Sequence, residues 1–485
     1  MSQTPSATRP GTPLGSARVS AVVGFLVLFE LVSGIVQGML PTLLPQLGAS
    51  LHISAGRLGW VNTTQLLAAA VCVPVFGRLG DMYGHRRLLR IAVVSLALGS
   101  VLVAWSPNFG LLLTGRVLQG PLAALLPLEI GLVRNRLDTH GARSAVGMLI
   151  GALTFGATVG MLVAGLLARS ISSVHGILWV PAIAVVLCAG VAFFLIPEAT
   201  SRTGGTVDWA GAGLLSVGLA SLLLAIAQGP SWGWTAGSTL GCFTLALVSM
   251  TVWVLVELRV PAPLIDVRLT VSRGLAPVYA ASFVLGAALY GSQTASVLFL
   301  ASPPQKLGYG FGYDALGIAW MMLPSSAFAF VGSTLVPRLI RAVGGRAALT
   351  GSGIVMAVGY VVMVLAHGAP WQFVTANCLI GLGTGLALGG LPSLVLDGAP
   401  ADRTGTATGV FNSFKTLGGS VGGAVFASVL TGITFAGTQV PKESAYTTVW
   451  LCCAGVSVLV ALASLLLVRH KADATPATAV AVPVG

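Results

Sequence analysis

The sequence predicts an all-α polytopic membrane protein. Two features of its composition indicate this fold class: 55% of the 485 residues are hydrophobic, and only 8% are charged, against roughly 25% charged residues in an average soluble protein. So few charges cannot cover the surfaces of water-soluble domains. The composition therefore excludes nearly every class of soluble enzyme, and we expect no enzymatic activity.

Fourteen apolar stretches are each long enough to cross a hydrocarbon core of about 30 Å as a helix, which takes about 20 residues. Runs of this length without alternation fit helices rather than the strands of a membrane barrel. The first stretch has no small-residue cleavage site, so we expect an uncleaved span rather than a signal peptide. The expected spans are residues 20–44, 57–79, 88–105, 109–133, 144–168, 176–196, 208–228, 237–258, 274–300, 314–336, 347–366, 372–396, 406–435 and 447–468.

Positive charges are distributed unevenly between the two sides of these spans. If the amino terminus is cytoplasmic, nineteen of the 25 Lys and Arg residues fall in cytoplasmic loops and tails. The others are Arg57, Arg169, Lys306 and Lys442 outside and Arg116 and Lys415 within spans. By the positive-inside rule we expect a multi-pass protein of the cell membrane with both termini in the cytoplasm. The same distribution explains the net charge of +12 without a nucleic-acid partner.

An internal repeat relates spans 1–6 to spans 9–14. Residues 77–89 align with 337–349, which pairs Gly84 with Gly344, and residues 147–160 align with 409–422. Because six is even, both halves have the same orientation, as in transporters that rock two bundles about a central site. The expected division is a cytosolic tail 1–19, a six-helix bundle 20–196, inserted helices 7 and 8 with their loops 197–273, a second six-helix bundle 274–468 and a cytosolic tail 469–485.

The loop expected between spans 2 and 3 reads GRLGDMYGHRR over residues 77–87 and resembles the corresponding loop of the major facilitator superfamily. This resemblance implies the major facilitator fold of two six-helix bundles, here with two inserted helices. An acid among arginines can exchange partners as two halves move, so we expect a conformational latch; a simple topology anchor is the alternative. The expected latch residues are Gly77, Arg78, Gly80, Asp81, Gly84, Arg86 and Arg87, with Arg338 and Arg341 in the second half.

Span 4 carries Arg116-Val-Leu-Gln119-Gly120, which resembles an element associated with proton transfer in proton-coupled exporters of this superfamily. An ion about 12 Å deep, at ~1.5 Å per residue, is costly unless it has a partner. Glu30 in span 1 reaches a similar depth, so we expect Glu30 to carry the proton and Arg116 to control its protonation. A static ion pair is the alternative. Glu129, later in span 4, is expected to join either the proton pathway or the latch.

Two further elements resemble those of the fourteen-span drug:proton antiporters. Leu44-Pro45-Gln46-Leu47 resembles their element at the end of span 1, but Val36 stands where they carry an aspartate. Residues 412–422 resemble their span-13 motif, with Lys415 in place of an arginine. A mid-membrane lysine indicates a function. It can attract an anionic substrate group, interact with Glu30 or pair structurally, and these alternatives stay open.

Glycines in span 5 follow each other at intervals of four and five residues, and small residues on one face let helices approach closely. The stretch resembles an antiporter motif, with Ala157 at the position of its proline. Generic helix packing without a role in export is the alternative. The glycines expected to pack helices are Gly147, Gly151, Gly156 and Gly160 in span 5 and Gly418, Gly419 and Gly422 in span 13.

Uncharged polar and aromatic side chains at depth predict a substrate cavity of the kind that is mostly apolar with a few polar groups. Interhelical hydrogen bonds are the alternative role for each polar member. The expected cavity residues are Phe29, Gln37, Asn62, Gln65, Gln119, Phe155, Tyr290, Gln293 and Asn412.

Together these features predict a proton-coupled antiporter that exports drugs, antibiotics or other amphipathic organic compounds by alternating access. The expected partners are the lipid bilayer and a small amphipathic substrate, and the chain is expected to be a monomer. The proton is the only coupling ion expected, with no metal or other cofactor. A proton-coupled uptake symporter for a metabolite, favoured by the missing proline of span 5, and a non-transporting membrane sensor are the alternative functions.

Overall fold

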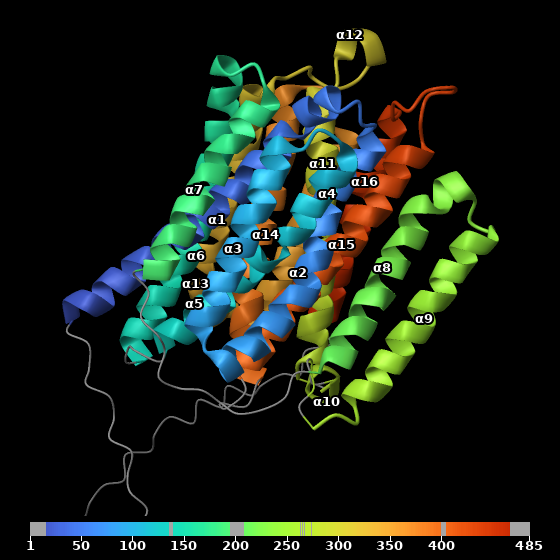
Figure 1. Ribbon diagram of the computed structural model, residues 1–485. Helices are drawn as coiled ribbons and strands as arrows, with labels where there is room; N and C mark the ends of the chain where they lie inside the picture. Colours follow the sequence, from blue (N-terminus) through green and yellow to red (C-terminus); the bar gives the residue numbers. More distant parts are fainter. Residues whose placement is uncertain are drawn as a thin grey trace, which may run out of the picture.

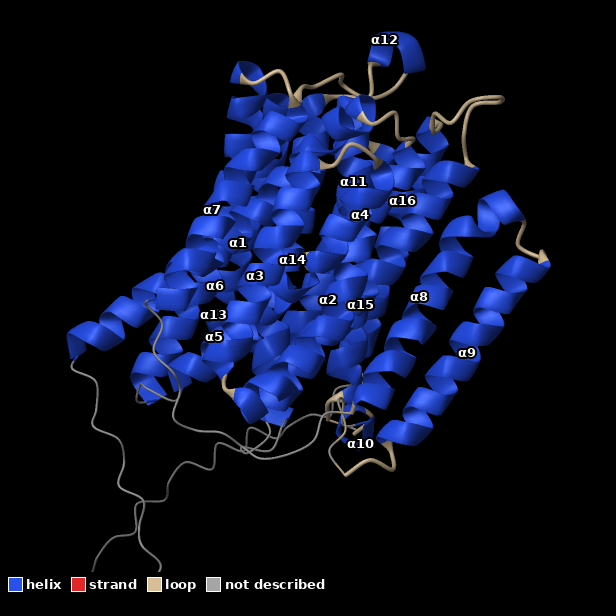
Figure 2. Ribbon diagram, viewed as in Figure 1, coloured by secondary structure: helices blue, strands red, loops and turns tan. Residues whose placement is uncertain are grey.

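The computed structural model describes residues 16–134, 139–194, 208–261, 263, 265, 267–272, 274–398 and 404–465. These residues are almost entirely helical (Figures 1 and 2), and the only β pairing among them is one bridge between Thr434 and Pro441. The elements are α1 (Ser16–Ser50), α2 (Ala55–Tyr83), α3 (His85–Trp105), α4 (Phe109–Leu118), η1 (Gly120–Ala124), α5 (Leu125–Arg134), α6 (Thr139–Ser170), α7 (Val174–Phe194), α8 (Trp209–Trp232), α9 (Gly237–Glu257), α10 (Val267–Thr270), α11 (Ala276–Ala301), α12 (Pro304–Leu307), α13 (Ala315–Leu365), α14 (Pro370–Gly398), α15 (Thr404–Gly432) and α16 (Glu443–Leu465).

Twelve helices in the described ranges are long and apolar enough to cross a membrane, so the chain is a multi-pass membrane protein. One of them combines α4, η1 and α5 into a single crossing, Phe109–Val133. Two features make the twelve consistent with fourteen crossings. The 51-residue α13 has two arms that join at Gly344, and the more polar α15, with 29 residues, is also long enough to cross.

The internal repeat aligns two turns, one in each half, and the aligned glycine has a positive φ in both turns. Gly84, between α2 and α3, has a φ of 99°, and Gly344, between the arms of α13, has a φ of 84°. Glycine adopts positive φ without the steric penalty of a Cβ atom. The alignment of the two halves therefore corresponds to a shared structural feature.

Residues 77–87, expected as the loop between spans 2 and 3, are mostly helical. Helix α2 continues to Tyr83, and α3 begins at His85, so Gly84 is the only residue between them. The charged residues of this segment interrupt the apolar pattern but not the helical hydrogen bonds. Residues 77–81 therefore lie in the last turns of α2.

In each half, the fifth helix packs closely on the first: α6 on α1, and α15 on α11. At the contacts, a Cβ atom on a glycine of the fifth helix would collide with the backbone of the first. The pairs are Gly156 with Leu31, Gly160 with Ile35, Gly418 with Phe283 and Gly422 with Ala287. Glycine permits this approach because it carries no side chain.

For the other three glycines expected to pack helices, the structure shows no such collision with the backbone of the first helix. Gly419 faces Tyr290 of α11 and Leu66 of α2. Gly151 has open space around the position of a Cβ atom, so no neighbouring helix requires a glycine there. The surroundings of Gly147 lie outside the described residues.

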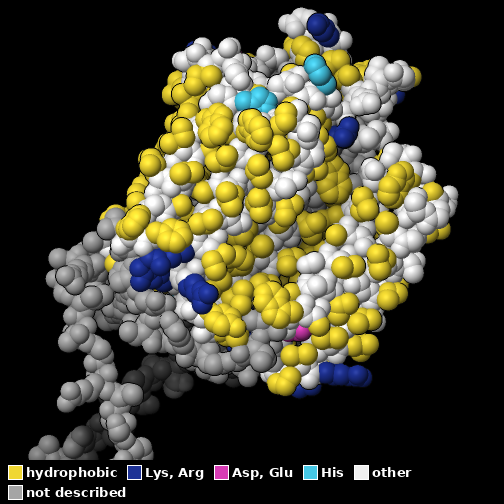
Figure 3. Space-filling model, in the orientation of Figure 1, with side chains coloured by type: hydrophobic (Ala, Val, Ile, Leu, Met, Phe, Trp, Pro, Cys, Tyr) yellow, Lys and Arg dark blue, Asp and Glu magenta, His cyan; other side chains and the backbone are white. Residues whose placement is uncertain are grey.

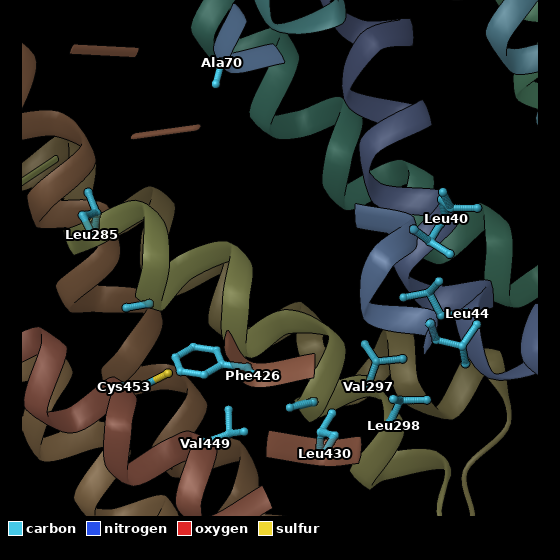
Figure 4. Packing of buried hydrophobic residues seen from close by; sticks show 14 of the residues in the cluster. Leu40, Leu44, Ala70, Leu285, Val297, Leu298, Phe426, Leu430, Val449 and Cys453 are labelled. Atoms are coloured by element: carbon cyan, nitrogen blue, oxygen red, sulfur yellow. The ribbon is translucent and has the colours of Figure 1, made fainter. Parts of the chain in front are cut away.

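Several contacts join the halves toward the end of the bundle that carries α12 (Figure 1), here called the α12 end. Near this end, Gly59 of α2 lies against Ala427 of α15, and Gly165 of α6 lies against Leu316 of α13. Figure 4 shows Leu44 of α1 near Val297 of α11, within one apolar cluster. Arg169 and Asp314 add an exposed ion pair of 3.6 Å. The structure is therefore closed between the halves at the α12 end.

Helices α8 and α9 lie beside the main bundle, with α9 outermost (Figure 1). Helix α8 packs against α9, α15 and α2. Its first turn is capped by Asp208, whose Oδ1 accepts a hydrogen bond from the Gly211 N–H at 2.7 Å. Within the described residues, the inserted pair therefore contacts both halves mainly through α8.

The surface of the bundle matches a lipid environment. Figure 3 shows hydrophobic side chains spread over the middle of the visible face, while lysines and arginines lie toward its two ends. Many large apolar side chains are exposed on this surface, including Leu98, Leu187 and Leu247. Contiguous apolar surface of this extent is typical of contact with a membrane.

Candidate functional site

Arg116, at the end of α4, lies at the centre of a buried polar cluster, and only 3% of its surface is exposed. Its Nε donates to the carbonyl oxygen of Val61 at 2.8 Å. Its Nη1 donates to Gln119 Oε1 at 2.6 Å, and its Nη2 donates to Asn62 Oδ1 at 3.2 Å and to Gln65 Oε1. All the hydrogen-bond acceptors of Arg116 among the described residues are neutral oxygens. The guanidinium is held by amide oxygens rather than by a carboxylate.

Helical spacing explains why these side chains meet. Asn62 and Gln65 are three residues apart on α2, so they share one face of that helix. Arg116 and Gln119 have the same spacing at the end of α4. The expected cavity residues Asn62, Gln65 and Gln119 are thus brought together, but as ligands of Arg116.

Two hydrogen bonds extend the cluster. Gln119 Nε2 donates to Ser100 Oγ of α3 at 3.0 Å, and Asn62 Nδ2 donates to Thr294 Oγ1 of α11 at 3.2 Å. The second bond crosses from one half of the chain to the other. We did not predict Ser100 or Thr294 from the sequence, because hydroxyl side chains are frequent in membrane helices and usually bond to their own helix.

A cavity of about 20 Å³ adjoins Arg116 and has room for about one water molecule. Val36 of α1 and Gln119 line it, together with apolar residues of α3 and α7. Val36 is the position at which the antiporters that the sequence resembles carry an aspartate. Helix α1 therefore supplies no acid beside Arg116.

Glu30 and Glu129 instead form a carboxyl pair between α1 and α5. Their side chains are 1% and 0% exposed, and the two carboxyl groups lie within hydrogen-bonding distance of each other. Both oxygens of Glu129 and Oε1 of Glu30 have no other hydrogen-bond partner among the described residues. No described cation acts on either group.

This arrangement differs from the expected contact between Glu30 and Arg116, which the structure does not show. Glu30 precedes Val36 by six residues, about 9 Å along the axis at ~1.5 Å per residue. Glu30 therefore lies nearer than Val36 to the start of α1, and its side chain faces α5 rather than α4. Two buried carboxylates side by side repel each other strongly, so the pair is suited to binding a proton and releasing it.

Lys415 of α15 is partly buried, and its Nζ lies 5.8 Å from the centre of the Phe411 ring. No hydrogen bond or ion pair of this Nζ is found within the described ranges. Its neighbour Asn412 donates from Nδ2 to the carbonyl oxygen of Ala123 in η1 at 3.3 Å. Lys415 thus contacts no acid in the part of the chain that the structure describes.

The remaining expected cavity residues are dispersed. Phe29 is buried in the apolar core of the first half, and Gln37 bonds to Ser33 of its own helix. Phe155 is 64% exposed. Tyr290 and Gln293 of α11 are partly buried, and Tyr290 lies beside Gly419.

The expected latch stays a prediction. Arg87, Arg338 and Arg341 are exposed, while the Nε atoms of Arg78 and Arg86 are buried without a hydrogen-bond partner among the described residues. The side chain of Asp81 lies outside the described residues.

A second cavity, of about 460 Å³, lies between the halves at the α12 end. Its lining contains no Asp, Glu, Lys or Arg and includes Leu58, Tyr309 and Tyr446. Tyr309 donates from its hydroxyl to the carbonyl oxygen of Pro441 at 2.6 Å. Burial raises the pKa of this phenol above its ordinary value.

The described part of the chain contains no group of three or more His, Cys, Asp and Glu residues that could hold a metal ion.

Comparisons with a family model, with curated proteins and with solved structures all match this chain to membrane transporters. The family model described as Major Facilitator Superfamily matches residues 26–423. The chain is 31% identical to the probable actinorhodin transporter of Streptomyces coelicolor, over 80% of this chain and 67% of that protein. It is 27% identical to the multidrug resistance protein Stp of Mycobacterium tuberculosis, over 79% and 70% of the two chains. The crystal structure of the POT family transporter PepTSo has the same fold, with a TM-score of 0.67 and 13% identity over 94% of this chain and 98% of that one.

Proposed function

Because this chain belongs to the major facilitator superfamily, we propose that it is a proton-coupled antiporter that exports drugs, antibiotics or other amphipathic organic compounds by alternating access. Relatives named for antibiotic transport and multidrug resistance support the export of such compounds. The observation that carries the proposal is the buried carboxyl pair of Glu30 and Glu129, beside which the described residues place no cation.

The carboxyl pair is the proton-binding group of the proposed cycle. A proton that enters from outside binds one carboxylate and removes the repulsion between the two groups. After the halves move, the proton leaves to the cytoplasm, and the pair regains its negative charge. One charge that moves through 100 mV corresponds to about 2.3 kcal/mol. The inward flow of protons thereby drives substrate outward.

The moving bodies are the two bundles, residues 20–196 and 274–468, with the inserted segment 197–273 beside them. The contacts between the halves at the α12 end correspond to the state that is closed to the outside. Opening there requires the seam between α2 and α15 and the Arg169–Asp314 ion pair to separate. The segments around Gly84 and Gly344 are the corresponding latches at the opposite end.

We further infer that the protein is a monomer in the cell membrane, with both termini in the cytoplasm and no nucleic-acid partner. The excess of Lys and Arg in the loops on the side of the termini supports this orientation. Helix α12 then lies on the outer side.

A resistance assay tests the export function. We expect the chain, produced in a pump-deficient bacterium, to raise resistance to some compounds of a panel of antibiotics and dyes, and a protonophore to abolish this resistance. Glu30→Gln should remove the resistance while the protein still inserts into the membrane. Accumulation of a compound in the producing cells would indicate uptake instead, and resistance unaffected by the protonophore would contradict proton coupling.

A further inference from the structure

We propose that Lys415 binds an anionic group of the substrate, so that the exported compounds are amphipathic organic anions. This inference rests on the proposed export function and names its substrate class. Three observations carry it: Lys415 lies between the halves, no described acid contacts it, and aromatic side chains lie beside it.

Lys415 lies on the face of α15 that is directed at the first half of the chain. Residues three before and four after it share this face, because helical neighbours are three or four residues apart. Asn412, three before, bonds to Ala123 of η1, and Gly419, four after, lies against Leu66 of α2. The lysine therefore occupies the interface between the two bundles, where alternating access requires the substrate to bind.

Four of the elements around Lys415 provide no negative charge. Helices α4, η1, α11 and α15 contain no Asp or Glu. The only acid of α2, Asp81, lies fifteen residues beyond Leu66, about 22 Å along the helix at ~1.5 Å per residue. Glu30 and Glu129 interact with each other. Within the described residues, the lysine has no internal counter-ion.

Arg116 of α4 is a second buried positive charge, in the first half of the chain. Its described partners are neutral oxygens, which orient the guanidinium but do not neutralise it. Two uncompensated cations in a low-dielectric interior attract an anion and repel a cation. The proposed binding site between the bundles therefore selects negatively charged compounds.

The surroundings of Lys415 also fit an aromatic body on the anion. The Phe411 ring lies next to the ammonium group, and Tyr290 of α11 lies beside Gly419, one turn from the lysine. An ammonium group with flanking aromatic rings matches a compound whose acidic group is attached to an apolar ring system.

Two permanently charged aromatic probes of similar size, 2-naphthalenesulfonate and 1-methylquinolinium, test this inference. In inverted membrane vesicles with an acidic lumen, export is measured as uptake of the radiolabelled probe. We expect uptake of the sulfonate, and we expect Lys415→Gln to reduce its kcat/KM by about tenfold or more, the effect of losing one charge-assisted contact. Lys415→Arg should retain most of the uptake, which separates the charge from a general effect on folding.

The remaining outcomes overturn the inference in distinguishable ways. Uptake of the quinolinium but not of the sulfonate would retain the export function and refute the anionic substrate class. Equal loss of sulfonate uptake in Lys415→Gln and Lys415→Arg would assign the lysine a structural role. Uptake of neither probe, together with no resistance in the panel assay, would refute export and this inference with it.

Discussion

Asn62 of α2 donates a hydrogen bond to Thr294 of α11 at 3.2 Å and accepts one from Arg116 at 3.2 Å. One amide group thus joins the buried cation of the first half to the second half. When the halves separate at the α12 end, the Asn62–Thr294 bond has to break. The orientation of the amide, and with it the environment of Arg116, then depends on whether the protein is open or closed to the outside.

Replacing Thr294 with Val should shift the protein toward the outward-open state. The change keeps the shape of the side chain but leaves the buried Asn62 amide without its acceptor, which destabilises the closed state by about 1–3 kcal/mol. Spin labels on the exposed residues Arg57 and Val440, one in each half at the α12 end, should show a larger population of long distances. Thr251→Val in α9, whose hydroxyl bonds to its own helix, is the matched control. An unchanged distance distribution in Thr294→Val would contradict this role.

Replacing Arg116 with Lys should reduce transport strongly while the charge is kept. A lysine ammonium cannot reproduce the planar set of donors that contacts Val61, Gln119, Asn62 and Gln65. We expect purified Arg116→Lys to unfold at a lower temperature and to transport at least about tenfold more slowly, which corresponds to about 1.4 kcal/mol. Full activity of this variant would show that only the charge at residue 116 matters.

An acid at Val36 should be tolerated better than one at Val32, four residues earlier on α1. Val36 borders the cavity beside Arg116, so a carboxylate there gains a cation as partner. Val32 belongs to the same apolar cluster as Val36 but does not line this cavity, and an unpaired buried acid is costly. Thermal unfolding in detergent should therefore show a smaller loss of stability for Val36→Asp than for Val32→Asp. Equal losses would contradict the placement of Val36 next to Arg116.

The glycines of α6 should differ in their tolerance of alanine. A Cβ atom at Gly156 would collide with the backbone of Leu31, whereas the same atom at Gly151 meets open space. Overpacking of a close contact costs about 1–3 kcal/mol. Gly156→Ala should lower the midpoint of thermal unfolding, and Gly151→Ala should leave it unchanged. Equal midpoints would contradict the close packing of α1 and α6.

The membrane helices could be predicted from the sequence because each crossing needs its own apolar run. The repeat also predicted that Gly84 and Gly344 occupy equivalent places, since glycine is the residue that adopts a positive φ at little cost. The continuation of α2 to Tyr83 could not be predicted in the same way. Hydropathy reports which residues avoid water, and a helix can continue through charged residues.

The partners of the buried charges could not be predicted from depth alone. Glu30 and Arg116 were matched because each is a similar number of residues from an end of its span. Depth does not specify the rotation of a helix about its axis, and Glu30 faces Glu129 while Val36 faces Arg116. Thr294 belongs to the cluster only because α2 and α11 pack together, a contact between residues 232 positions apart.

The most direct test of the central claim is the proton dependence of transport by variants of the carboxyl pair. In inverted vesicles, uptake of an exported compound found in the panel assay is compared with and without an imposed acidic lumen. The wild type should accumulate the compound only with the gradient, as should Glu443→Gln, a control at an exposed glutamate of the α12 end. Glu30→Gln with Glu129→Gln should give the same uptake in both conditions. Accumulation driven by the gradient in this double variant would contradict the account.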